Sequence, residues 1–252
     1  MVVVALCLVA AIGYWFAGRR HVRLWGARPR WSRRAWRTTA FLSALLLVAL
    51  LYGPFDWALR QRLWLQTAGT MAVLMVAGPL LVLGAPGARL WRRLGFGRAS
   101  PRGRGRSIAA FTLFSATLCL AYLPAIYRLT APVGLARQAS QVAIVLVGYA
   151  FWSQVIAQPG RPCALSHIGR VAYLFLSSVQ VRILGLVLGF APASFYGVPL
   201  IDQQLAAGVM MVPGVLSDLI VLTVCMYLWL AQDERRHLGG SDRGGRLVSL
   251  AG

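Results

Sequence analysis

Seven long apolar stretches constrain this chain of 252 residues more than any other feature. Each approaches the roughly 20 residues needed to cross a hydrocarbon layer, and a backbone in lipid has to make its hydrogen bonds within its own segment. The sequence therefore predicts an all-α fold, a polytopic membrane protein built as a bundle of seven transmembrane helices. The predicted helices cover residues 2–18, 38–55, 63–83, 108–127, 140–157, 171–190 and 206–230.

The arginines predict how this bundle is oriented. The chain has no lysine, and 21 of its 26 arginines fall in alternate polar segments, at residues 19–37, 89–106, 161–170 and 235–246. Four arginines lie in the other polar segments, and Arg182 lies inside a predicted helix. Because short arginine-rich loops stay on the cytoplasmic side, we expect the N-terminus outside and the C-terminus in the cytoplasm.

The composition leaves little room for anything besides the bundle. Apolar residues make up 58% of the chain and charged residues 13%, which is far from the balance of a soluble domain. We expect a seven-helix transmembrane domain over residues 1–231 and a polar cytoplasmic tail over residues 232–252. The first apolar stretch should be retained as a helix, since no basic residue precedes it as in a signal peptide.

The formal net charge of +20 could indicate nucleic acid in a soluble protein. Here the arginines flank helix ends, where they meet the anionic head groups of lipids. The predicted partner is therefore the lipid bilayer, with no nucleic acid, and the predicted location is the bacterial plasma membrane, crossed several times.

Two ionisable residues lie inside predicted helices, where a charge is costly and needs a partner or a task. Arg182 and Asp218 each lie 12 residues from the predicted inner end of their helix, so both are roughly 18 Å deep. We predict that they form an intramembrane ion pair. A neutral clamp between two helices is the simpler interpretation, and a functional relay is the alternative.

Polar side chains gather at the predicted outer ends of the helices, and two helices contain sulfur close to them. Met71 and Met75 lie four residues apart, and Met210 follows Asp202 in the last helix. Thioether sulfur suits cuprous copper, so these four residues are candidate metal ligands, although methionine in an apolar helix is usually a packing residue. Glycines and prolines interrupt two of the predicted helices, which predicts close helix contacts and carbonyls that must be bonded elsewhere. They are Gly69, Gly78, Pro79, Gly84 and Pro86 in the third helix and Gly208, Pro213 and Gly214 in the seventh.

Two stretches, residues 71–86 and 202–214, carry a family resemblance. The first ends in Pro-Leu-Leu-Val-Leu-Gly-Ala-Pro and the second begins with Asp-Gln-Gln. Together they resemble the CtaG family of cytochrome c oxidase assembly factors, which serve caa-type oxidases. The family consists of integral membrane proteins linked to supplying copper to the oxidase. The motif positions in this chain are Pro79, Gly84, Pro86, Gln203 and Gln204.

The resemblance also implies four histidines that this chain lacks. Their positions are taken by Gln66 and Thr70 on the third helix and by Arg137 and Gln141 before the fifth. Glutamine and threonine bind copper poorly, and an arginine cation repels it. The outer metal site is therefore either lost or rebuilt from the methionines and Asp202, and copper is a doubtful cofactor.

These observations favour a copper-related factor in cytochrome c oxidase assembly and respiratory chain biogenesis, with oxidase subunits or a copper chaperone as partners. A small-solute or metal transporter is the alternative, because charged residues and broken helices can line a substrate path. We do not expect an enzyme, since the outer half offers two carboxylates and no histidine. A retinal protein is excluded, because without lysine no Schiff base can form.

Overall fold

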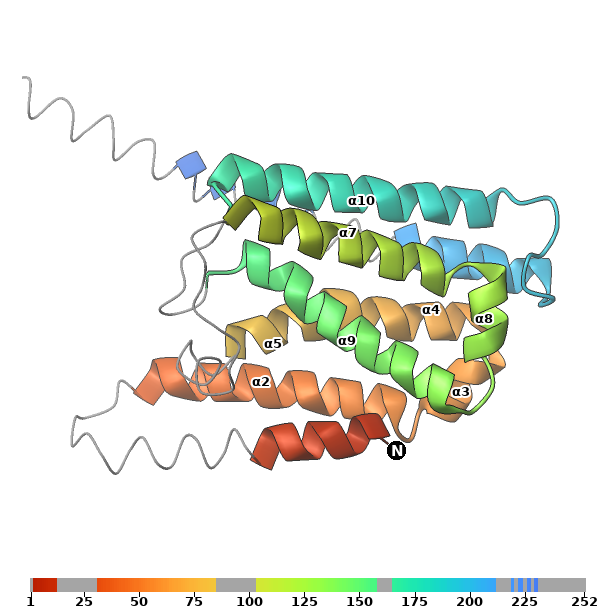
Figure 1. Ribbon diagram of the computed structural model, residues 1–252, viewed down its shortest axis with the longest axis horizontal. Coiled ribbons are helices and arrows are strands. Elements are labelled where there is room, and N and C mark those ends of the chain that lie inside the picture. Colours follow the sequence, from red (N-terminus) through yellow and green to blue (C-terminus); the bar gives the residue numbers. More distant parts are fainter. Residues whose placement is uncertain are drawn as a thin grey trace, which may run out of the picture.

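The computed structural model describes residues 2–12, 31–84, 103–157 and 165–211, together with residues 219, 222, 223, 226, 227, 229 and 230. Every regular element in this part of the chain is a helix, which confirms the predicted all-α fold (Figure 1). Two helices, Leu63–Gly84 and Ile168–Gly189, are long and apolar enough to cross a membrane alone. The bent pair Gly105–Ala121 and Pro124–Thr130 adds a third candidate span, and the count of seven spans stays a prediction.

Each predicted apolar stretch overlaps at least one observed helix. The chain begins with the short apolar helix Val2–Ile12, and residues 200–211 form a helix near the C-terminal end of the described chain. Between them lie α2 (Trp31–Tyr52), α3 (Asp56–Gln61), α4 (Leu63–Ala72), the π-helix η1 (Val73–Ala77), α5 (Gly78–Gly84), α7 (Gly103–Ala121), α8 (Pro124–Thr130), α9 (Leu135–Val155) and α10 (His167–Gly189).

Several predicted boundaries were wrong. The helices α2, α7, α9 and α10 all begin four to seven residues before the apolar stretches that predicted them. Arginine and alanine are good helix formers, so a helix continues past the end of its apolar stretch. The stretch 108–127 was also wrong as one helix, because α7 and α8 meet at an angle of 78°. Pro124 causes this break, since it has no N–H and holds Leu123 in an extended conformation.

Successive long helices run in alternating directions (Figure 1). The helices α2, α7 and α10 begin at the left of the view. The continuous segment from α4 to α5, the helix α9 and the helix 200–211 run back towards the left. The short helices α3 and α8 lie together with segment 190–199 at the right, and we call this region the α3–α8 end. This is the end that the arginine distribution predicts to face outwards.

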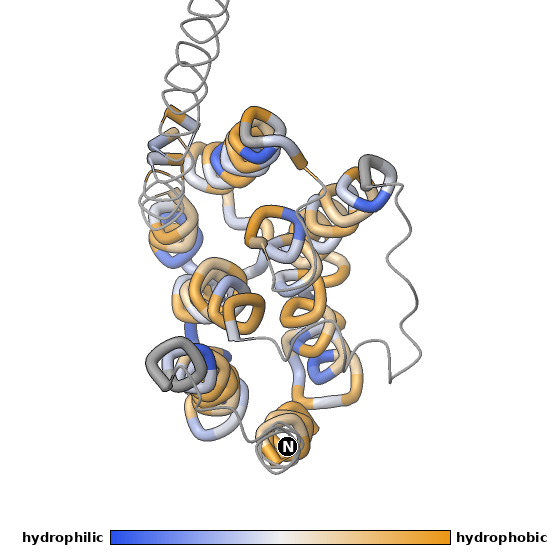
Figure 2. Tube along the Cα trace, turned by 90° about the vertical axis from the view of Figure 1, so that its left-hand side faces the viewer, coloured by the Kyte–Doolittle hydropathy of each residue, from blue (hydrophilic) through white to orange (hydrophobic). Residues whose placement is uncertain are grey.

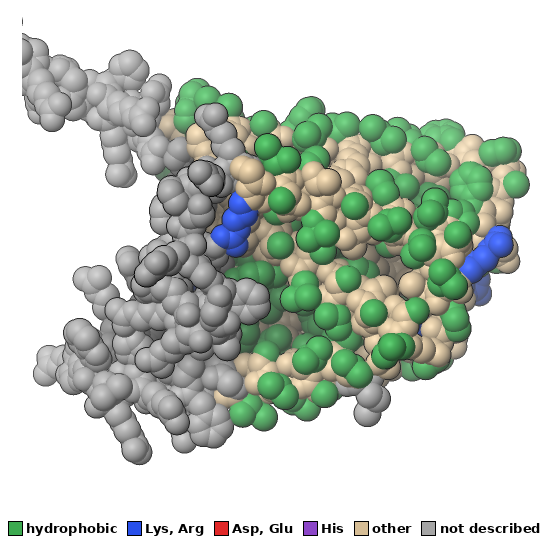
Figure 3. All heavy atoms as spheres, viewed as in Figure 1, with side chains coloured by type: hydrophobic (Ala, Val, Ile, Leu, Met, Phe, Trp, Pro, Cys, Tyr) green, Lys and Arg blue, Asp and Glu red, His purple; other side chains and the backbone are tan. Residues whose placement is uncertain are grey.

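The exterior of the bundle is apolar. Viewed along the helices, the tube is mostly orange with blue confined to short patches (Figure 2). Over the described part of one face, hydrophobic side chains cover the helices, and arginines show only near the two ends (Figure 3). Phe175, Ile183 and Val187 of α10 are each more than half exposed. Such a surface suits contact with lipid.

Helix α9 lies at the centre and packs against η1, α5 and α7. Its Phe151 stacks on Phe114 of α7 with ring centroids 4.3 Å apart and also contacts Tyr173 of α10. Trp152 is 2% exposed and donates its indole N–H to the carbonyl of Leu74 in η1 at 2.7 Å. Through α9, these aromatic contacts connect η1 with α7 and α10.

The bond from Trp152 compensates for Pro79. In η1 the Gly78 N–H donates to the Val73 carbonyl five residues back, so the next carbonyl, that of Leu74, would pair with residue 79. Proline has no N–H, and the indole of Trp152 takes its place. Gly78 allows this approach, because a Cβ there would lie 2.7 Å from Trp152 Cδ1. The expectations of a freed carbonyl and of close helix contact in the third span are both confirmed.

The other glycines that predicted close helix contacts give different results. A Cβ on Gly84 would lie 2.5 Å from the Phe41 Cβ, so α5 touches the backbone of α2 there. No described residue lies within 4 Å of a Cβ added at Gly208, so the close packing expected at this glycine is not found among the described residues. Pro86, Pro213 and Gly214 lie outside the described residues.

Candidate functional site

Polar residues from several helices meet at the α3–α8 end, and Asp56 is the centre of one group. Its Oδ1 accepts hydrogen bonds from Arg137 Nε at 3.0 Å, Arg137 Nη2 at 2.8 Å and Gln141 Nε2 at 2.8 Å. Its Oδ2 lies 3.3 Å from Arg60 Nε, one turn along α3. We call these four residues the Asp56 cluster.

The Asp56 cluster neutralises a buried cation at an unfavourable place. Arg137 is 5% exposed and lies in the first turn of α9, where the helix dipole disfavours positive charge. Asp56 provides the opposite charge from α3. Sequence reasoning placed both residues at this end but did not pair them. A buried arginine in this region requires an acid, and Asp56 and Asp202 are the two acids of this end in the described chain.

Asp202 has an architectural contact. Its Oδ2 accepts a hydrogen bond from the backbone N–H of Leu63 at 2.8 Å, and Leu63 is the first residue of α4. The residue that would normally cap α4, Arg62, makes no such bond with its side chain. Asp202 therefore caps α4 from a neighbouring helix, where its charge also suits the helix dipole. It is 2% exposed, and Oδ1 has no hydrogen-bond partner among the described residues.

Gln203 joins the helix 200–211 to α10. Its Nε2 donates to the Leu188 carbonyl in the last turn of α10 at 2.9 Å, and its Oε1 accepts from the Phe195 N–H at 2.9 Å. The side chain is fully buried, whereas Gln204 beside it is exposed. The start of the Asp-Gln-Gln motif thus holds three parts of the chain together.

Tyr196 stabilises the break between α7 and α8. Its hydroxyl donates to the Tyr122 carbonyl at 2.6 Å, and its ring meets Tyr127 edge-on at 4.8 Å. Burial, with a smaller contribution from the Tyr127 hydroxyl, raises the pKa of Tyr196 to about 12. The Tyr196 hydroxyl therefore remains a hydrogen-bond donor at neutral pH.

The candidate methionine ligands lie deeper than Asp202. Met71 and Met210 are buried in the hydrophobic core, and Met75 packs against it. Met71 follows Leu63, the residue capped by Asp202, by eight positions, which is about 12 Å along a helix. Met210 is separated from Asp202 by the same number of residues along its own helix. A site shared by Asp202 and either methionine would therefore have to span about two turns of helix.

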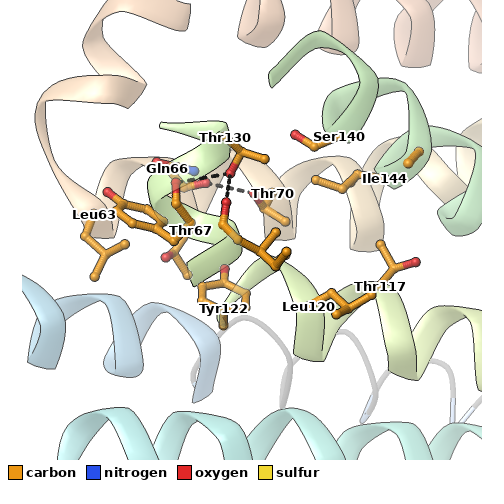
Figure 4. Close-up of a pocket in the computed structure, with 14 residues that line it drawn as sticks. Leu63, Gln66, Thr67, Thr70, Thr117, Leu120, Tyr122, Thr130, Ser140 and Ile144 are labelled. Carbon is orange, nitrogen blue, oxygen red and sulfur yellow. Dashed lines mark hydrogen bonds between the residues drawn. The ribbon is translucent and has the colours of Figure 1, made fainter. Parts of the chain in front are cut away.

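Gln66 and Thr70 line a cavity of about 220 Å³ between α4, α7, α8 and α9 (Figure 4). Both residues lie on the cavity side of α4, one turn apart, and Thr70 Oγ1 donates to the Gln66 carbonyl at 3.0 Å. The four positions where the resemblance implies histidines therefore divide into two groups. Gln66 and Thr70 face the cavity, while Arg137 and Gln141 bind Asp56. Within the described residues no group of three His, Cys, Asp or Glu side chains could hold a metal.

Asp218, the predicted partner of Arg182 within the membrane, lies outside the described residues. Arg182 is partly buried, and its Nε has no hydrogen-bond partner in the part of the chain that the structure covers. A polar contact that sequence reasoning missed lies two residues away. Gln180 Oε1 accepts from Ser115 Oγ at 2.6 Å and joins α10 to α7.

Fold and site together define an all-helical protein with an apolar exterior and a polar network at one end. A family model described as the cytochrome c oxidase caa3 assembly factor, Caa3_CtaG, matches residues 12–232. Because this match covers most of the chain, the protein belongs to that family, which confirms the resemblance found in the sequence. No curated protein and no solved structure gives a significant match.

Proposed function

We propose that this protein is a non-catalytic, membrane-embedded assembly factor for a cytochrome c oxidase, and that it has lost its outer metal site. The membership of the family supports the assembly role. The proposed loss of the metal site is supported by a single observation, the Asp56 cluster. Its contacts explain what two of the substituted histidine positions do instead.

The Asp56 cluster disfavours a cation at this place. Arg137 brings a fixed positive charge, and its Nη2 lies 2.8 Å from the nearest carboxylate oxygen. The same oxygen also receives the Gln141 amide, so Asp56 is already neutralised and hydrogen-bonded by protein groups. A copper ion would have to displace these donors and approach a buried guanidinium.

The alternative metal site, built from Met71, Met75, Asp202 and Met210, has less support. Asp202 caps α4 at a different depth from Met71 and Met210, and the methionines lie in or against the core. The transporter alternative gains no support from the contacts among the described residues.

Copper loading of the purified full-length protein tests the loss of the metal site. Under reducing conditions with cuprous copper, we expect the wild-type chain to retain substoichiometric metal. A variant with four restored histidines (Gln66→His, Thr70→His, Arg137→His, Gln141→His) should retain more. Stoichiometric copper on the wild-type chain that disappears in Met71→Leu or Asp202→Asn would overturn the proposed loss and favour the alternative site.

We propose that partners, either oxidase subunits or a copper chaperone, contact the α3–α8 end. Trp57 of α3 and Leu129 of α8 are 59% and 64% exposed there, close in sequence to Arg60 and Arg128. Exposed aromatic side chains beside arginines are common at the energetic centres of protein interfaces.

Affinity purification of the tagged protein from its native membrane tests this contact. The double variant Trp57→Ala and Leu129→Ala should recover less oxidase subunit than wild type. The matched control is Leu46→Ala with Ile183→Ala, which removes exposed side chains from α2 and α10, each six residues before the end of its helix. Equal recovery from both variants would contradict a contact at this end, and unchanged levels of assembled oxidase after gene deletion would contradict the assembly role itself.

A further inference from the structure

The cavity between α4, α7, α8 and α9 lies beside the break between α7 and α8 (Figure 4). Among the described residues that line it, none carries a charge. Six have a threonine or serine hydroxyl or a glutamine amide: Gln66, Thr67, Thr70, Thr117, Thr130 and Ser140. The rings of Tyr122 and Tyr127 complete the wall near the break. A charged ligand would lose its hydration here without meeting an opposite charge.

Three hydroxyl groups of the wall are arranged as acceptors. Thr70 donates to the Gln66 carbonyl, Thr130 to the Ile126 carbonyl at 3.0 Å, and Ser140 to the Arg137 carbonyl at 2.8 Å. A hydroxyl has one proton and two lone pairs, so each of these oxygens keeps only acceptor capacity for a ligand. They come from three different helices. At these three positions a ligand that donates hydrogen bonds therefore fits better than one that only accepts them.

The volume of the cavity and the aromatic residues in its wall favour a ligand with a single ring. An apolar cavity of about 150 Å³ is sufficient to bind benzene, so about 220 Å³ accommodates one ring with small substituents. Tyr127 is held edge-on against Tyr196, and Tyr196 is bonded to the Tyr122 carbonyl. The Tyr127 ring is thus supported from behind by Tyr196, and aromatic rings attract one another in offset or edge-on arrangements.

The cavity reaches the side of the bundle. Leu120 of α7 lines it and is 51% exposed, in the same helix whose exterior is apolar. A ligand that enters past Leu120 comes from the surface that would face lipid, so it has to be soluble in the bilayer.

We propose that this cavity binds an uncharged, membrane-soluble phenol or hydroquinone. The ring lies between Tyr122, Tyr127 and Ile144, and its hydroxyl groups donate to Thr70, Thr130 or Ser140. This site is independent of the proposed assembly role, because it would exist whether or not the protein contacts an oxidase.

Direct binding to the full-length protein in lipid nanodiscs tests the proposal, with hydroquinone as the probe. Saturation-transfer NMR and a competition titration should show binding at millimolar concentration or below. Toluene, which cannot donate, should bind more weakly, and benzoate, which is charged, should not bind. Absence of hydroquinone binding, or equal binding of toluene, would overturn the proposed ligand class.

Variants locate the site. Ala143→Leu fills the cavity and should abolish binding, whereas Ala139→Leu changes an exposed alanine one turn away on α9 and should leave binding intact. Thr130→Val and Ser140→Ala each remove an acceptor and should weaken hydroquinone, but not toluene, by about threefold to tenfold. These two variants keep the test decisive if Ala143→Leu fails to fold. Binding that is unaffected by all three cavity variants would place the ligand elsewhere and refute the proposal.

Discussion

The bond between Trp152 and the Leu74 carbonyl gives the sharpest test of how this bundle is held together. Trp152→Phe keeps an aromatic ring in place but removes the indole N–H. Pro79 offers no N–H, so the Leu74 carbonyl would then be buried without a donor. An unsatisfied buried group costs about 1–3 kcal/mol. The smaller ring leaves a void that adds about 1 kcal/mol, since Trp152 is 2% exposed.

We therefore expect Trp152→Phe to lower the free energy of unfolding by about 2–4 kcal/mol. Unfolding of the purified full-length chain by SDS in mixed micelles, followed by far-UV circular dichroism, measures this change. The matched control is Trp57→Phe, the same substitution at a side chain that is 59% exposed, and it should change stability by less than about 0.5 kcal/mol.

Repeating the Trp152→Phe substitution in a Pro79→Ala variant isolates the role of Pro79. Pro79→Ala restores an N–H at the position where the π-helix would use it, so the Leu74 carbonyl no longer depends on the indole. Trp152→Phe should then cost about 1 kcal/mol less than it does beside Pro79. An equal cost in both backgrounds would refute the compensation, even if Trp152→Phe is destabilising by itself.

Three further predictions concern charges and orientation. Asp56→Ala should lower the free energy of unfolding by about 2–3 kcal/mol, because it leaves Arg137 buried without its partner, and Arg137→Gln added to it should recover part of this loss in the same SDS assay. Asp218→Ala alone should reduce the yield of folded protein more than Asp218→Ala with Arg182→Ala, and equal losses would count against the predicted ion pair. A cysteine introduced by Trp57→Cys should react with a membrane-impermeant maleimide added to intact cells, and labelling only after lysis would reverse the predicted orientation.

The prolines and glycines show how far sequence reasoning reached into the packing. That Pro79 frees a carbonyl follows from its chemistry, and that Gly78 permits a close neighbour follows from its size. Neither identifies the neighbour, because Trp152 lies 78 residues from Leu74 along the chain. The same limit applies to Asp202. Its polarity indicates that it lies at a helix end, but it does not identify Leu63 as the hydrogen-bond partner, because Leu63 is 139 residues away along the chain.

The sequence by itself determined the helical fold, the approximate place of each long helix, the family, and the absence of histidine at the four expected positions. These are local or compositional properties, set by the transfer of apolar side chains and by the hydrogen bonds within a helix. Only the tertiary structure decided that Arg137 and Gln141 share Asp56, that Asp202 caps α4, and that Gln66 and Thr70 face a cavity. Those contacts depend on which helices cross and at what depth, and this is fixed by side-chain packing between segments far apart in the chain.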